Sequence, residues 1–158
     1  MGLVTFVRAT RIDASADAVF DWHEAPGAFE RLTPSWERVR VLRHRGGIKD
    51  GARVSLLVGP APISMRWELE HRDYQRGRSF TDTQISGPFR SWKHVHRMLP
   101  DGPNACTLED TIQYELPLGA FGAICGGWFV RRKLRRLFAH RHAVTRQAFE
   151  RPTRVQPL

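Results

Sequence analysis

The sequence is poor in the residues that mark several common classes of protein. It has only two cysteines, Cys106 and Cys125, which form neither a Cys-x-x-Cys pair nor a zinc-type spacing with histidine. It has no run of roughly 20 apolar residues, the length that crosses a bilayer. The first residues become polar by Arg8, without the apolar core of a signal peptide. We therefore expect no disulfide framework, no membrane span and a reducing, cytoplasmic location.

Fingerprints of nucleotide binding and of common catalytic machinery are also missing. No GxGxxG segment follows an expected strand, no GK[ST] sequence occurs, and there is no nucleophile elbow. The sequence therefore predicts no cofactor, and any function has to come from side chains that the fold gathers.

The length and the charge set further limits. A chain of 158 residues is the size of one domain and can bury about two-thirds of its unfolded surface. We expect a single domain over residues 1–151 and a short basic tail over residues 152–158. The formal net charge of +9 invites an anionic partner, but much of the excess lies near the C-terminus and so describes one element.

Hydrophobic periodicity and turn signals predict an α+β fold. Short helices are expected over residues 16–23 and 28–32, and a long helix after residue 119. About seven strands are expected over residues 2–12, 37–44, 52–58, 63–74, 80–96 (two strands joined by a turn at Gly87-Pro88) and 105–116. Short connections between consecutive strands favour a curved antiparallel sheet, which the long helix must cover, leaving space between them.

Residues 80–96 organise this prediction, because polar and aromatic side chains share their strand faces. Period-two alternation places Phe80, Asp82 and Gln84 on one strand face, and Trp92, His94 and His96 on the next. On the following strand, Asp110 shares a face with Leu108, Ile112 and Tyr114. Such a mixture suits the wall of a half-polar cavity better than a dry core.

Asp110 is the most informative of these residues. A carboxylate on an apolar face needs a partner, since burying an unpaired charge is very costly, and a histidine on the neighbouring strand could supply it. His94 and Asp110 are therefore our candidates for an acid–base pair. Structural register, ligand hydrogen bonding and catalysis all remain open for the group. The predicted ligand-binding residues are Trp67, Asp82, Gln84, Trp92, His94, His96, Asp110 and Tyr114.

A metal ion is an alternative use of the same residues. His94 and His96, two apart on a strand, could share an ion with Asp82 or Asp110. The His-x-His pattern is common, however, and no third histidine lies nearby in the sequence. We therefore predict no metal site.

The expected C-terminal helix combines an apolar stripe with a basic face. The stripe contains Val130, Leu134, Leu137, Phe138, Val144 and Ala148. We assign His140, Arg141, His142 and Arg146 to the cationic outer face, together with the run over residues 131–136. This face could simply be solvated, or it could contact an anionic membrane surface through Arg131, Arg132, Arg135 and Arg136. Nucleic acid is not favoured, because no RNA-binding aromatic motif or helix-turn-helix spacing is present.

Five segments carry a resemblance to a known superfamily. They are PGAFERLTP (26–34), IKDGARV (48–54), FTDTQISGPFRSWKHVH (80–96), LEDTIQYELPLG (108–119) and RRLFAHRH (135–142). Together with the element order, they resemble the helix-grip fold of the START/polyketide-cyclase-like (SRPBCC) superfamily. They look like a bacterial subgroup that occurs alone or as the N-terminal domain of epimerase-fused proteins, some labelled as cell-division inhibitors.

This resemblance implies a cavity beneath the long helix that takes hydrophobic or amphipathic molecules such as lipids, polyketides or aromatic compounds. A minority of the superfamily are cyclases or dehydratases, so an enzyme using the Asp–His pair is the alternative. A third possibility is an adaptor that acts through the basic helix.

Overall fold

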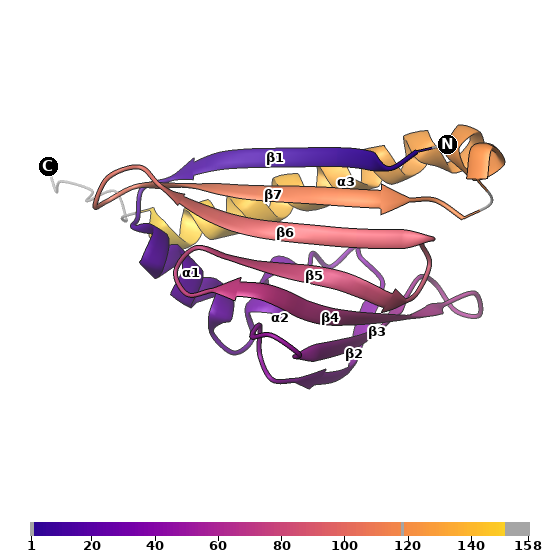
Figure 1. Ribbon diagram of the computed structural model, residues 1–158, viewed down its shortest axis with the longest axis horizontal. Coiled ribbons are helices and arrows are strands. Elements are labelled where there is room, and N and C mark those ends of the chain that lie inside the picture. Colours follow the sequence, from indigo (N-terminus) through magenta and orange to yellow (C-terminus); the bar gives the residue numbers. More distant parts are fainter. Residues whose placement is uncertain (1, 118, 151–158) are drawn as a thin grey trace, which may run out of the picture.

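The structure of the protein is a computed structural model that describes residues 2–117 and 119–150, without the side chains of residues 119–125 (Figure 1). The predicted tail of residues 152–158 lies outside the described residues. The elements follow the predicted order. They are β1 (Val4–Ile12), α1 (Ala16–Glu24), α2 (Ala28–Leu32), β2 (Val39–Arg45), β3 (Arg53–Val58), β4 (Met65–Gln75), β5 (Ser79–Ser86), β6 (Ser91–Pro100), β7 (Cys106–Glu115) and α3 (Gly119–Phe149).

The strands form one antiparallel sheet in the order β1-β7-β6-β5-β4-β3-β2. Consecutive strands are neighbours from β2 to β7, because short turns connect them. The first strand departs from this rule and pairs with the last, so that β1 and β2 are the two edges. The first and last strands of the chain, β1 and β7, therefore lie side by side at one end of the sheet, next to α3.

The long helix α3 runs behind the sheet, and α1 and α2 lie on the same side (Figure 1). Ser15 caps α1 by accepting a hydrogen bond from the backbone nitrogen of Ala18. A seven-stranded antiparallel sheet curved around one long helix is the helix-grip arrangement that we expect, so the predicted fold class is confirmed.

Two apolar clusters fill the space between the layers. One joins α1 to the ends of β1, β5, β6 and β7 around Phe20 and Met98. The other joins α3 to the middle of the sheet around Leu56, Ile112 and Phe138. Two buried histidines connect these clusters, since His96 stacks on Phe80 of the first and His94 packs against Phe138 of the second.

The inner face of α3 differs from the predicted stripe. Leu134 and Phe138 are buried as expected, but Ala148 is exposed. The next two buried positions are polar, namely His142 and Thr145. Both continue the spacing of three and four residues from Phe138, so they share its face. The predicted stripe contained only apolar residues, so it did not include the buried positions His142 and Thr145.

The strand expected over residues 63–74 begins later, at Met65. Pro60 and Pro62 precede it and cannot donate to a strand ladder, so the chain stays in a loop up to Ser64. Ile63 lies in this loop and is 74% exposed.

Replacing Phe20 by alanine should test the first cluster. Phe20 is fully buried and its ring packs against those of Tyr74 and Phe80. We expect Phe20→Ala to lower the free energy of unfolding by about 3–5 kcal/mol, measured by urea denaturation. The matched change Val7→Ala, at a side chain that is 54% exposed, should cost less than about 0.5 kcal/mol. Equal costs would contradict this description of the core.

Candidate functional site

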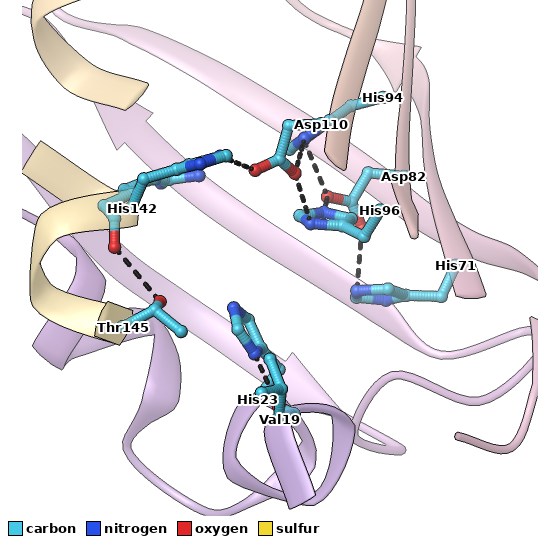
Figure 2. A network of polar contacts seen from close by, with 10 residues as sticks. Val19, His23, His71, Asp82, His94, His96, Asp110, His142 and Thr145 are labelled. Atoms are coloured by element: carbon cyan, nitrogen blue, oxygen red, sulfur yellow. Dashed lines mark hydrogen bonds and ion pairs between the residues drawn. The ribbon is translucent and has the colours of Figure 1, made fainter. Parts of the chain in front are cut away.

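Strand register brings together most of the polar residues predicted from the sequence. On β5 and β6, Asp82 lies opposite His94. On β6 and β7, His96 lies opposite Asp110. Period-two alternation then points all four side chains toward α3, into the layer between sheet and helix (Figure 2). The predicted partnership between Asp110 and a histidine of the neighbouring strand is present in the structure.

Asp110 is the centre of this cluster. Its Oδ1 atom accepts a hydrogen bond from Nε2 of His94 at 2.8 Å and lies 2.9 Å from Nδ1 of His96. Its Oδ2 atom lies 2.7 Å from Nε2 of His142, which belongs to α3 (Figure 2). One buried carboxylate therefore links two strands to the long helix.

Asp82 forms a second centre on the other side of β6. Its Oδ2 atom lies 3.0 Å from Nε2 of His96 and 3.5 Å from Nδ1 of His94. Its Oδ1 atom lies 2.9 Å from Nε2 of His71, on β4. Each of the two β6 histidines thus lies between two carboxylates, with one ring nitrogen toward each.

This arrangement determines the charges. Burial alone would raise the pKa of both carboxyls, but the charge of His96 and hydrogen bonds from the surrounding imidazoles hold the pKa of Asp82 and of Asp110 well below the usual range. Burial would lower the pKa of His96, yet the charge and hydrogen bonds of Asp110 and Asp82 outweigh it and raise that pKa to about 9. His96 can donate from both ring nitrogens only as an imidazolium ion. The cluster is therefore a buried network of carboxylates and imidazoles in which positive and negative charges offset one another.

His142 is a correction to the sequence analysis, which assigned it to the outer face of α3. It is 1% exposed. Besides its contact with Asp110, its Nδ1 atom lies 2.8 Å from Oγ1 of Thr10 on β1. Since Thr10 can donate its hydroxyl hydrogen, His142 can accept at Nδ1 and donate at Nε2 as a neutral ring. The helix is thereby joined to both β1 and β7.

Arg141 is a second correction on the same helix. It packs inward, with its guanidinium 5.2 Å from the ring centre of Phe138 and 5.9 Å from that of Phe29. Burial lowers the pKa of Arg141, while the charges of Asp110 and Asp82 partly offset this effect. Its Nε atom has no hydrogen-bond partner among the described residues. The only sequence signal for this placement is its spacing of three residues from Phe138.

A cavity of about 350 Å³ lies between α3, α2 and the concave face of the sheet. Four of the predicted ligand-binding residues line it, namely Trp67, Asp82, Trp92 and His94. At one end the rings of Trp67, Phe89 and Trp92 pack together, with centres 4.8–5.6 Å apart. Gly87 permits this packing, because a Cβ there would collide with Trp67. At the other end lie Asp82, His94 and Arg141, so one end of the cavity is apolar and one is polar.

The other predicted residues do not line this cavity. His96 and Asp110 lie behind its polar end, in the network. Gln84 donates to the backbone oxygen of Phe89 at 2.8 Å and so holds the turn between β5 and β6. Tyr114 is fully buried beneath Phe89 and Trp92.

A second cavity, of about 360 Å³, reaches the network from the opposite side, below α1 and α2. Its wall includes His23, His71 and His96. Phe29, Asp82 and Arg141 line both cavities, so they form the partition between them. Sequence reasoning missed this cavity and the part that His71 plays. The available signal for His71 is that it shares a strand face with Trp67 and Leu69.

The basic surface lies on the outer side of α3. Arg131, Arg132, Arg135 and Arg136 are all exposed, as predicted. The guanidinium of Arg136 lies over the ring of Trp36 and that of Arg132 over Trp128. Among the helices that the structure describes, none has both the length and the apolar character needed to cross a membrane. The predicted contact of the four arginines with an anionic surface stays a prediction.

Sequence and fold are both similar to those of known proteins. Residues 12–140 match the family model described as polyketide cyclase / dehydrase and lipid transport. The fold is similar to that of norcoclaurine synthase from Thalictrum flavum in complex with dopamine and hydroxybenzaldehyde. The match covers 97% of this chain and 90% of the synthase chain at 12% identity, with a TM-score of 0.71. The Zhui aromatase/cyclase from Streptomyces sp. R1128 covers 98% of both chains at 16% identity, with a TM-score of 0.69.

A third similar structure is the nucleoside-diphosphate sugar epimerase from Corynebacterium glutamicum. It is 21% identical with a TM-score of 0.70, and the match covers 90% of this chain but only 28% of the epimerase. At these identities the likeness of the structures concerns the fold. No curated protein matches the sequence.

The pH dependence of stability should reveal the burial of His23. Burial lowers its pKa from 6.5 to about 4, although a hydrogen bond to the backbone oxygen of Val19 partly opposes this effect. Between these two pH values the unfolded chain binds a proton that the folded protein does not. Stability should therefore fall as the pH falls from 6.5 to 4, by up to about 3 kcal/mol from this residue.

Urea denaturation across this range would measure the effect. We expect His23→Gln to flatten the profile between pH 4 and 6.5, whereas His44→Gln, at an exposed histidine, should keep the wild-type slope. Parallel profiles for His23→Gln and the wild type would contradict the assignment.

Proposed function

Because the chain belongs to the polyketide cyclase/dehydrase and lipid transport family, we propose that it binds a small hydrophobic or amphipathic molecule in the first cavity. The observation that carries this proposal is the cavity itself. Its volume of about 350 Å³ is within the range of small-molecule sites, and apolar side chains make up most of its wall. Transfer of an apolar ligand into such a wall is favourable because it removes apolar surface from water.

The two ends of the cavity support an amphipathic ligand held in one orientation. An aromatic ring or an alkyl chain fits against the apolar wall that includes Trp67 and Trp92. A carbonyl, hydroxyl or carboxylate oxygen fits the other end, where the guanidinium of Arg141 can donate hydrogen bonds. Such a ligand would give Arg141 the acceptor that its Nε atom lacks among the described residues.

We also propose that the chain belongs to one particular subgroup of this family. The five sequence segments support membership in the bacterial subgroup that is also found fused to epimerase-like domains, and the partial match to the Corynebacterium glutamicum epimerase agrees with it. The single domain over residues 1–151 and the cytoplasmic location stay predictions.

Native mass spectrometry of freshly purified protein would test ligand binding. We expect a co-purified molecule in the wild type and its loss in Leu137→Trp, because Leu137 lines the cavity and an indole would fill it. The fluorescent dye 1-anilinonaphthalene-8-sulfonate serves as a second probe of the cavity. Its affinity for this variant should be at least about tenfold lower than for the wild type.

Leu99→Trp is the matched control, since Leu99 is 42% exposed and lies away from the first cavity. Binding of the dye to a folded Leu137→Trp variant with wild-type affinity would contradict the proposal, as would the absence of both a bound molecule and dye binding in the wild type.

Acid–base catalysis, as in a cyclase or dehydratase, is the second candidate function. The observation that favours it is the position of His94, which lines the cavity while Asp110 behind it holds Nε2 at 2.8 Å. A carboxylate that orients an imidazole toward a ligand is the arrangement of a general base.

Turnover would separate this function from binding alone. The molecule recovered from the wild type is incubated with fresh protein, and loss of water is followed by mass spectrometry. We expect His94→Gln to retain binding but to slow conversion by at least about 100-fold. His140→Gln serves as the control, because His140 packs against Trp36 outside the cavity. No conversion by the wild type would exclude this reaction, and equal rates of conversion in both variants would exclude a catalytic role of His94.

A further inference from the structure

The buried network contains more than a ligand-binding cavity requires. Of its six acidic and imidazole side chains, only Asp82 and His94 line the first cavity. The remaining members are His71, His96, Asp110 and His142, all buried. Four histidines in contact with two carboxylates also exceed what is needed to fix the register of three strands, since apolar alternation already does so.

Three of these residues converge as metal ligands do. One ligand atom from each of Asp82, His94 and His96 lies within 4.8 Å of the other two. Oδ2 of Asp82 is 3.0 Å from Nε2 of His96 and 3.5 Å from Nδ1 of His94. Two atoms bound at about 2.0–2.1 Å to one tetrahedral ion lie roughly 3.3 Å apart, so these separations fit a shared ion with little movement.

The opposite side of each ligand is held in place. The second ring nitrogens of His94 and His96 lie 2.8 and 2.9 Å from the same oxygen of Asp110. The second oxygen of Asp82 lies 2.9 Å from His71. Histidines that bind metals usually donate their other nitrogen to a carboxylate in this way, which fixes the ring and makes it a stronger ligand.

The charges also suit a divalent ion. Two buried carboxylates need two positive charges nearby. A divalent cation between Asp82 and the two β6 histidines would supply both. We propose that Asp82, His94 and His96 form a binding site for a divalent transition-metal ion, through Oδ2, Nδ1 and Nε2 respectively. Two imidazole ligands favour zinc, iron, cobalt or nickel over magnesium and calcium.

The cavities give this site access to solvent and to small molecules. Asp82 lines both cavities, His94 lines the first, and His96 lines the second. Three protein ligands leave a tetrahedral ion one open position, the pattern of catalytic rather than structural zinc sites. This inference does not rest on the proposed ligand, and it replaces our sequence-based prediction of no metal site.

Metal titration of untagged protein, stripped with a chelator and dialysed, would test the site. We expect one Zn²⁺ per chain by calorimetry and by elemental analysis, and a visible absorption spectrum of low-symmetry coordination with Co²⁺. His94→Gln and His96→Gln should each abolish both signals. Asp110→Asn keeps all three ligands and should weaken Zn²⁺ binding by about 10–100-fold.

Controls separate the site from surface binding and from unfolding. His140→Gln should bind Zn²⁺ as the wild type does, because His140 lies on α3 outside the network. Circular dichroism checks that each variant is folded. If His94→Gln does not fold, Asp82→Asn takes its place and should likewise lose the Co²⁺ spectrum.

No stoichiometric binding by the wild type, or unchanged affinity in folded His94→Gln and His96→Gln, would overturn the proposal. Unchanged affinity in Asp110→Asn would overturn the role assigned to Asp110. Because no organic ligand is used, failure here is distinguishable from failure of the proposed function.

Discussion

Two carboxylates in the interior, Asp82 and Asp110, are the constraint on which the arrangement of the layers depends. A buried negative charge is tolerated only where hydrogen-bond donors and positive charge surround it. These partners come from β4, β6 and α3, so the two carboxylates fix how those elements lie relative to one another. The apolar clusters hold the layers together, but they would accept small shifts that the network does not.

Much of this arrangement can be predicted from the sequence, for a physical reason. Alternation along a strand is strict, so reading Asp82, His94 and Asp110 onto one face needs only the correct period. Pairing of strands in chain order then brings these side chains together, as β5, β6 and β7 do. The contact between Asp110 and His94 follows from these two rules, whereas the helix-grip fold was expected from the order of helices and strands and from the resemblance of five segments to the superfamily.

The remaining parts could not be predicted because they depend on the packing of α3. A helix face is inferred from its apolar residues, and this inference places polar residues such as Arg141 and His142 outside by default. In the structure both point inward, since Asp110 and the cavity provide an environment that the sequence does not display. The second cavity depends on the positions of α1 and α2 over β2–β5, which are long-range contacts without a local pattern.

Some of the positive charge lies at an edge of the sheet, where it affects contacts between molecules. Among the strands that the structure describes, β1 and β2 each have a neighbour on one side only, and they lie at opposite ends of the sheet. Open edges of this kind invite pairing with a second molecule, which is the usual beginning of aggregation. Three exposed arginines lie along β2, at Arg40, Arg43 and Arg45. Two molecules that approached through their β2 edges would bring these like charges together, which disfavours pairing of one β2 strand with another.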